Sequence, residues 1–326
     1  MINDKEFLKF EEGFFKPYFE KFIEFKRGKG EKVASSTLIR FRKLNNSLNQ
    51  YQTNQISEQM IRELLAPRDG LSEIERQYMT SNLRQFCSFL VLLGVNAVAV
   101  PPKYTRTARC EFRPYIFSDE ELRRLVVAAD SLPSSKRTKT HQQIYPVLVR
   151  MLIGTGMRIG EVLALTRGDV DPLNGVVKVI NGKNGVSRYI PVSDSLKMVL
   201  CSYAETIDMS DEDKPFFASS YTGSHLTYDA MKYMFPKMFK AADIYMADGR
   251  TPNIHSIRHT FCTRSLEKML DGGMNIYTAI PILAAYVGHV NYMDTEKYIH
   301  LTEQGHEDFI KKEASLGSIF PEVIDE

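Results

Sequence analysis

The sequence predicts a mainly α-helical protein with one small β-sheet, organised in two domains. Apolar residues recur at three- and four-residue spacing along the first hundred residues and again in the second half, which is typical of amphipathic helices. One interval instead holds two β-branched runs, 176–180 and 186–192, separated by two Asn-Gly pairs. Asn-Gly between such runs is a strong hairpin signal. The 326 residues exceed one typical compact domain and suit two.

Residues 1–105 are expected to form a helical domain. Aromatic and aliphatic residues between positions 7 and 25 lie on one apolar helical stripe, which we assign to the core. Further helices are predicted from N-cap signals at 35–37 and from the patterns over 56–65 and 72–93. Gly94 and a pair of prolines at 101 and 102 then end the domain.

A basic linker is expected at 106–113, in a segment (PPKYTRTARCEFR) that carries four basic residues and a single acid. An α+β domain follows over 114–326. It opens with Ser118 at an N-cap and Glu121 three residues later, which is the pattern of a capping box. A further helical pattern covers 145–165, and the hairpin follows it.

The charge of the chain is unevenly distributed although its net value is only +2. Residues 1–113 contain 19 lysines and arginines against 13 acids, whereas residues 303–326 contain two lysines and seven acids. A basic half suits a polyanionic partner and an acidic tail could cap a basic groove. An ordinary solvated surface explains the same counts equally well, so charge alone does not decide between them.

Other features of the composition exclude several classes of protein. The four cysteines lie far apart without a CxxC pair, which argues against a zinc knuckle or a disulfide framework and suits a reducing compartment. No apolar run approaches the roughly 18 residues of a membrane span. The first residues lack the layout of a secretory signal. We therefore expect a cytoplasmic protein with no membrane partner.

Two candidate site residues lie near the predicted hairpin, one before its first strand and one at its tip. Arg158 stands in TGMRIGEVLAL, where two glycines bend the chain before a helix begins. An arginine at a helix start can join its guanidinium to the exposed N–H groups in holding an anion. Lys183 lies at the hairpin tip, from which it can reach outward. Each residue taken alone is more often simply solvated.

Two further clusters contain histidines. His255 and Arg258 share a helix face in HSIRHTF, and His255 and His259 have the spacing of a zinc-protease pair. That arrangement needs glutamate directly after the first histidine, and Ser256 stands there instead. With no obvious third ligand, we reject a metal site. His289 lies in a Gly-His turn, and Tyr298 follows nine residues later.

Taken together, these motifs resemble the tyrosine recombinases, also called phage-type integrases. The resemblance covers residues 114–302, and the part before it matches only in kind, as the helical core-binding (DNA-binding) domain. Its candidate catalytic residues are Arg158, Lys183, His255, Arg258, His289 and Tyr298. Met157 and Val287 replace leucines more usual in the family, and the interval of 31 residues between Arg258 and His289 is wide.

The resemblance implies a site-specific recombinase that cleaves and rejoins double-stranded DNA through a 3′-phosphotyrosine on Tyr298. In this chemistry Arg158 and Arg258 neutralise the phosphate, His289 adds a hydrogen bond, His255 accepts the phenol proton, and Lys183 protonates the leaving 5′-oxygen. It needs neither cofactor nor metal. The expected biological function is integration and excision of a mobile element, and the second candidate is chromosome-dimer resolution.

The family also implies a tetramer on paired DNA sites and allows accessory DNA-bending factors. The tail from residue 303, which mixes apolar residues with acids, is a candidate for docking into a neighbouring protomer, or for a helix folded back on its own domain. Two other functions stay open. One is a type IB topoisomerase that nicks and reseals DNA, and the other is a catalytically silent DNA-binding regulator on the same scaffold.

Overall fold

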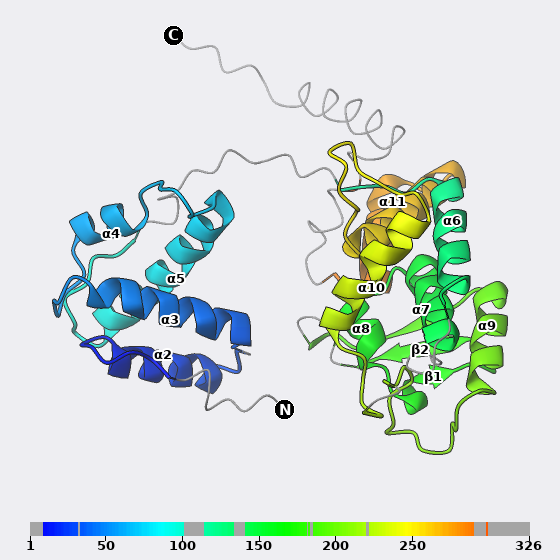
Figure 1. Cartoon of the computed structure of the whole chain (residues 1–326), viewed down its shortest axis with the longest axis horizontal. Helices are drawn as coiled ribbons and strands as arrows, with labels where there is room; N and C mark the ends of the chain where they lie inside the picture. The colour runs from blue at the N-terminus through cyan, green and yellow to red at the C-terminus, as the bar shows by residue number, and fades with distance from the viewer. Residues whose placement is uncertain are drawn as a thin grey trace, which may run out of the picture. The chain divides into compact units, whose positions relative to one another are not determined.

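The computed structural model describes residues 9–31, 33–100, 114–133, 141–180, 182, 185–219, 222–289 and 298 (Figure 1). The chain divides into two compact units, Met1–Phe112 and Arg113–Glu326. The predicted linker at 106–113 lies outside the described residues. The predicted fold class, mainly α with a small β-sheet, is confirmed. No helix of the described part is long and apolar enough to cross a membrane.

The first unit is a bundle of helices packed around aromatic side chains. Its described helices are α2 (Lys16–Gly28), α3 (Ser35–Asn49), α4 (Glu58–Leu64) and α5 (Glu73–Leu92). Most described residues of the predicted apolar stripe do form the core, where the rings of Phe19 and Phe86 stack with centroids 3.7 Å apart, but Phe14 and Phe25 are exposed. The prediction that this stripe lies on one continuous helix is wrong, because α2 begins only at Lys16, with Pro17 in its first turn.

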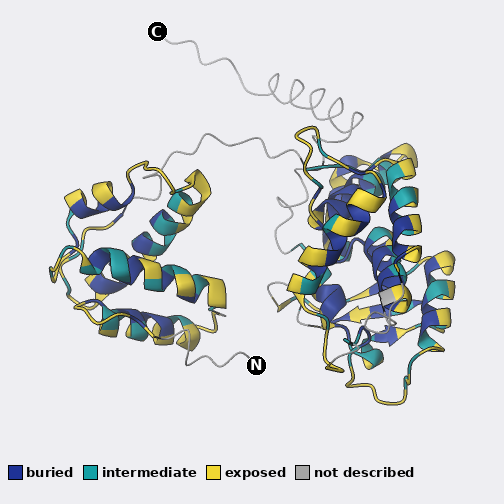
Figure 2. Ribbon diagram, in the orientation of Figure 1, coloured by how far each residue is buried: buried dark blue, intermediate teal, exposed yellow. Residues whose placement is uncertain are grey.

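The second unit contains the sheet and most of the remaining helices. Its helices are α6 (Asp119–Asp130), α7 (His141–Thr155), α8 (Ile159–Ala164), α9 (Asp194–Ala204), α10 (Tyr228–Ala241), α11 (His255–Asp271) and α12 (Ile276–Val287). The predicted capping box of Ser118 and Glu121 is present at the start of α6. In both units the buried residues gather where the helices face each other (Figure 2).

The helical pattern predicted over 145–165 forms two helices, and the bend predicted from its glycines is confirmed. The break lies between α7 and α8, where Gly156 adopts a positive φ of 59°. A Cβ at this position would lie 2.2 Å from the ring of Phe261 on α11, so the close approach of two segments requires glycine here. As a result Arg158 is the N-cap residue of α8, which confirms the prediction of an arginine at a helix start.

The sheet has three antiparallel strands in the order β1-β2-β3. The strands are β1 (Val170–Asp171), β2 (Val176–Val179) and β3 (Arg188–Pro191), preceded by a 3-10 turn η1 (Arg167–Asp169). The predicted hairpin is confirmed as β2 and β3, in which Val177 pairs with Ile190. Strand β1 was not predicted, because two residues are too short for a periodic pattern. Arg188 lies on the inward side with Ile190, since alternate residues share a face.

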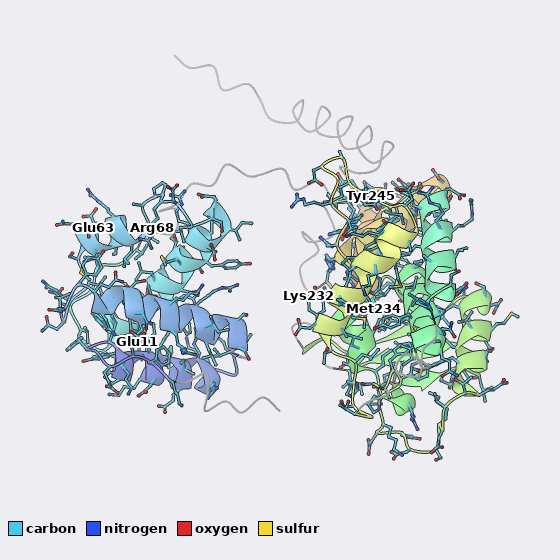
Figure 3. All side chains as sticks on the ribbon, in the orientation of Figure 1. Glu11, Glu63, Arg68, Lys232, Met234 and Tyr245 are labelled. Carbon is cyan, nitrogen blue, oxygen red and sulfur yellow. The ribbon has the colours of Figure 1, made fainter. Side chains whose placement is uncertain are left out.

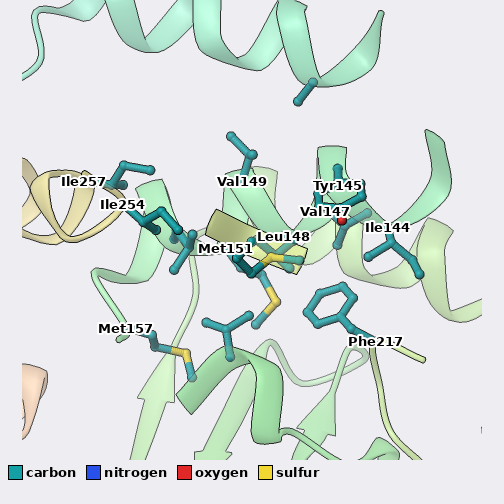
Figure 4. Packing of buried hydrophobic residues seen from close by; sticks show 14 of the residues in the cluster. Ile144, Tyr145, Val147, Leu148, Val149, Met151, Met157, Phe217, Ile254 and Ile257 are labelled. Carbon is teal, nitrogen blue, oxygen red and sulfur yellow. The ribbon is translucent and has the colours of Figure 1, made fainter. Parts of the chain in front are cut away.

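Apolar residues next to the candidate site are anchored in the main core of the second unit. Met157 precedes Arg158, while Ile254 and Ile257 flank the start of α11. All three are labelled among the packed side chains in Figure 4. Because a packed interior leaves little room for side chains to shift, the neighbouring polar residues are held in place by this packing.

Candidate active site

Arg258 is the most deeply buried charged residue of the site. Only 2% of it is exposed. Its Nη1 donates to the carbonyl oxygen of Gly156 at 2.9 Å, and its Nη2 donates to that of Val287 at 2.7 Å. Burial and the nearby Arg158 lower the pKa of Arg258 to about 10, which leaves the guanidinium charged at neutral pH.

Arg158 reaches the same region from the start of α8. Its Nη1 donates to Oε1 of Glu161 at 2.8 Å, and both Nη1 and Nη2 lie 3.3 Å from the carbonyl oxygen of Gly288. Arg158 and Arg258 therefore converge on consecutive carbonyls at the end of α12. Two segments about 100 residues apart in sequence thus bring two positive charges to one place.

Tyr298 is fully buried and its hydroxyl lies 2.9 Å from Nδ1 of His259. The His289 ring lies parallel to the Tyr298 ring, with centroids 6.5 Å apart and planes within 6°. Burial raises the pKa of Tyr298 well above its usual value, Cys262 adds to the rise, and the two arginines oppose it. The phenol is therefore protonated at neutral pH in this arrangement.

His255 is the first residue of α11 and is exposed. Its ring lies perpendicular to that of His259, with centroids 4.6 Å apart. The sequence prediction made His255 the base for the Tyr298 phenol, whereas in the structure the phenol lies within hydrogen-bonding distance of His259. His259 was considered only as half of a metal pair. The position of His259, directly after Arg258 and one helical turn after His255, was the signal in the sequence that could have placed it in the site.

Two further residues of the site were missed. Glu161 is buried and accepts hydrogen bonds from both Arg158 and Arg188. Burial alone would raise the pKa of Glu161, but the ion pairs, chiefly with Arg188, outweigh it and hold the pKa below its usual value. Glu161 could have been found as the capping-box partner of Arg158, and Arg188 as a charge at an inward position of a strand.

The remaining predicted residue, Lys183, lies outside the described residues. Among the residues that are described, no three histidine, cysteine, aspartate or glutamate side chains gather as a metal site would require. The structure thus brings together Arg158, Arg258, His289 and Tyr298, with His255 one helical turn from His259.

A family model described as the phage integrase family matches residues 116–305, which include every one of these residues. The chain belongs to this family. It is a tyrosine-type site-specific DNA recombinase, as its relatives' names also indicate. The Sinorhizobium fredii protein y4rE, named as an integrase/recombinase, is 31% identical over 67% of this chain and 69% of its own length. Tyrosine recombinase XerC of Listeria welshimeri is 28% identical over 69% of this chain and 70% of its own.

Solved structures of low sequence identity share the fold of this recombinase. The Tn1549 transposon integrase in complex with circular intermediate DNA has a TM-score of 0.64 at 19% identity, covering 90% of this chain and 99% of that one. A lambda integrase dimer bound to a COC′ core site has a TM-score of 0.63 at 16% identity, covering 86% of this chain and 94% of that one.

Proposed function

We propose that Tyr298 attacks a DNA phosphodiester held between Arg158 and Arg258. The observation that carries this proposal is the convergence of these three residues and His289 from separate segments on the end of α12. Charge grows on the nonbridging oxygens during the attack, and two guanidinium groups neutralise it through charge-assisted hydrogen bonds. His289 adds a further donor beside the nucleophile.

The phenol proton needs an acceptor, and the exposed His255 is the proposed base. His259 holds the phenol in the buried arrangement described above. A hydroxyl without exposed surface cannot meet a phosphate, so Tyr298 has to move away from its buried position before it attacks. Lys183 is the proposed acid for the leaving 5′-oxygen. The 3′-phosphotyrosine conserves the energy of the phosphodiester, so rejoining needs no cofactor.

The first unit, proposed over residues 1–105, binds duplex DNA. Its surface carries a cavity of about 580 Å³ between α3 and α5, lined by the basic residues Arg40, Lys43 and Arg68. Arg68 lies just beyond α4 (Figure 3). Arg40 also stacks over the Tyr78 ring, with its guanidinium carbon 3.8 Å from the centroid. Three basic side chains against one acid, Glu75, in the lining suit phosphate contacts, which position a protein on duplex DNA.

The active recombinase is proposed to be a tetramer that forms on paired DNA sites and integrates and excises a mobile element. Relatives and structural neighbours named as integrases support the proposed function in integration and excision. The tail from residue 303, which lies outside the described residues, is the proposed connector between protomers, and DNA-bending factors are the proposed accessories. The proposed catalytic domain spans residues 114–326.

The test of this proposal is covalent trapping on a nicked suicide substrate, which prevents rejoining. The native protein is expected to form a covalent DNA complex with or without a chelator. Tyr298→Phe should bind the same DNA with unchanged affinity and form no complex, because it lacks the nucleophilic oxygen. A complex formed by the Phe variant, or a complex that chelation abolishes and magnesium restores, would contradict the proposal.

A further inference from the structure

Three consecutive carbonyls at the end of α12 each accept a hydrogen bond from a different arginine. Nε of Arg188 donates to the carbonyl of Tyr286 at 2.8 Å, Arg258 donates to that of Val287 at 2.7 Å, and Arg158 lies 3.3 Å from that of Gly288. The last carbonyls of a helix lack intrahelical partners and carry the negative end of its dipole. Cations therefore stabilise this helix end, and His289 follows it directly.

Arg188 differs from the other two arginines because its remaining nitrogens face a carboxylate. Nη2 donates to Oε2 of Glu161 at 2.8 Å, and Nη1 lies 3.3 Å from Oε1. Its side chain is only 8% exposed. Oε1 of Glu161 also accepts from Nη1 of Arg158 at 2.8 Å. Arg188 is thus linked to Arg158 through one carboxylate and to the helix end before His289 through one carbonyl.

We propose that Arg188 is a positioning residue for strand cleavage. It satisfies one side of the Glu161 carboxylate, so that Arg158 shares this acid and keeps donors for a phosphate. Without Arg188, the buried Glu161 draws Arg158 into a closer two-point pair, because an under-compensated buried charge is costly. The same loss releases the Tyr286 carbonyl at the turn that precedes His289. This inference rests on the proposed role of Arg158 as a phosphate ligand.

The test compares single-turnover cleavage by the full-length protein at saturating DNA, so that binding does not limit the rate. Arg188→Gln should bind DNA as tightly as the native protein and cleave about 100-fold more slowly, as expected for a misplaced catalytic group. Arg188→Lys keeps one cationic group for two acceptors, the Tyr286 carbonyl and the Glu161 carboxylate. Its cleavage rate should lie between those of the native protein and Arg188→Gln. Arg150→Gln is the matched control, because Arg150 also forms a two-point ion pair, with Asp130, and should cleave normally.

A second substrate separates positioning from general damage to the fold. A methylphosphonate at the cleaved position carries no charge, so its reaction depends less on Arg158. If Arg188 acts through Arg158, the defects of Arg188→Gln and Arg158→Ala should both shrink to within about threefold on this substrate, since the lost contact no longer matters. The Lys variant supplies the same comparison if the Gln variant does not fold.

Equal defects of the Arg188 variants on both substrates, while Arg158→Ala shows the shrinking defect, would overturn the positioning role. Cleavage by Arg188→Gln at the native rate would overturn it as well. If instead Arg158→Ala is equally impaired on both substrates, the phosphate-binding role of Arg158 has failed, and the inference fails with it. A loss of DNA affinity without loss of the saturated rate would make Arg188 a binding residue.

Discussion

At the scale of single residues, the geometry explains why glycine stands at position 288. Gly288 ends α12 in the left-handed region, with φ of 69°. A Cβ there would lie 2.6 Å from Nη1 of Arg188 and 2.9 Å from its Cζ. Two features therefore exclude a side chain at this position: the backbone conformation, and the Arg188 guanidinium, which is held by its hydrogen bond to the carbonyl of Tyr286.

Gly288→Ala is expected to destabilise the protein more than the backbone penalty alone. Gly273→Ala is the matched control, because Gly273 has φ of 82° and no atom within 4 Å of an added Cβ. The control should cost about 1 kcal/mol from the left-handed conformation. Gly288→Ala should cost roughly 1–3 kcal/mol more, because Arg188 is displaced. Urea unfolding measures the free energy of unfolding of both variants. Equal losses would show that Arg188 can shift away from the added methyl group without destabilising the protein.

The sequence was enough to identify residues that meet in space but not to assign their hydrogen bonds. Arg158, Arg258, His289 and Tyr298 stand in motifs whose order can be compared, and they do lie together. The partner of the phenol is set by tertiary distances of a few ångströms, which favour His259 over His255. Spacing along a helix cannot distinguish two histidines one turn apart.

At the scale of elements, some helix starts were predicted, but the N-cap expected at 35–37 is wrong, because α3 begins at Ser35 after Ala34 and has no side-chain cap. The predicted capping box of Ser118 begins α6, and α5 begins with a further capping box at Ser72 that was not predicted. The break at Gly156 depends on a ring of α11 that lies about 100 residues away in sequence. The glycines of the motif indicated a bend here, but the packing that requires glycine at this position is set between elements and could not be found from a local pattern.

The pair of helices α3 and α5 carries a prediction for DNA binding. Replacing both Arg40 and Lys43 with Gln should weaken binding to all duplex sequences. It should also reduce the slope of log affinity against log salt by about 2, because each phosphate contact releases counterions. Binding isotherms at several salt concentrations measure the slope.

Arg62→Gln on α4 is the control for this prediction, because Arg62 is exposed outside the cavity and forms an ion pair with Glu58. It should leave the slope unchanged. If Arg62→Gln lowers DNA affinity by half as much as the double replacement of Arg40 and Lys43, the overall positive charge rather than this surface controls the binding. The first unit would then lose its proposed DNA-contacting face.

At the scale of the whole molecule, the chain forms two units that each have their own core. The first is built from aromatic residues of α2, α3 and α5, and the second surrounds the sheet and α7. A smaller apolar cluster joins α11 to α12, and Tyr298 belongs to it. Composition and length predicted two domains. They did not predict that the nucleophile would pack in a cluster between two helices.

The central claim is that Tyr298 is the residue that becomes bonded to DNA. Peptide mapping by mass spectrometry of the complex trapped on a suicide substrate tests this claim most directly. After digestion of both protein and DNA, the nucleotide adduct should lie on the peptide that contains Tyr298, and on the phenolic oxygen within it. An adduct on any other residue, such as the nearby Tyr292, would contradict the account.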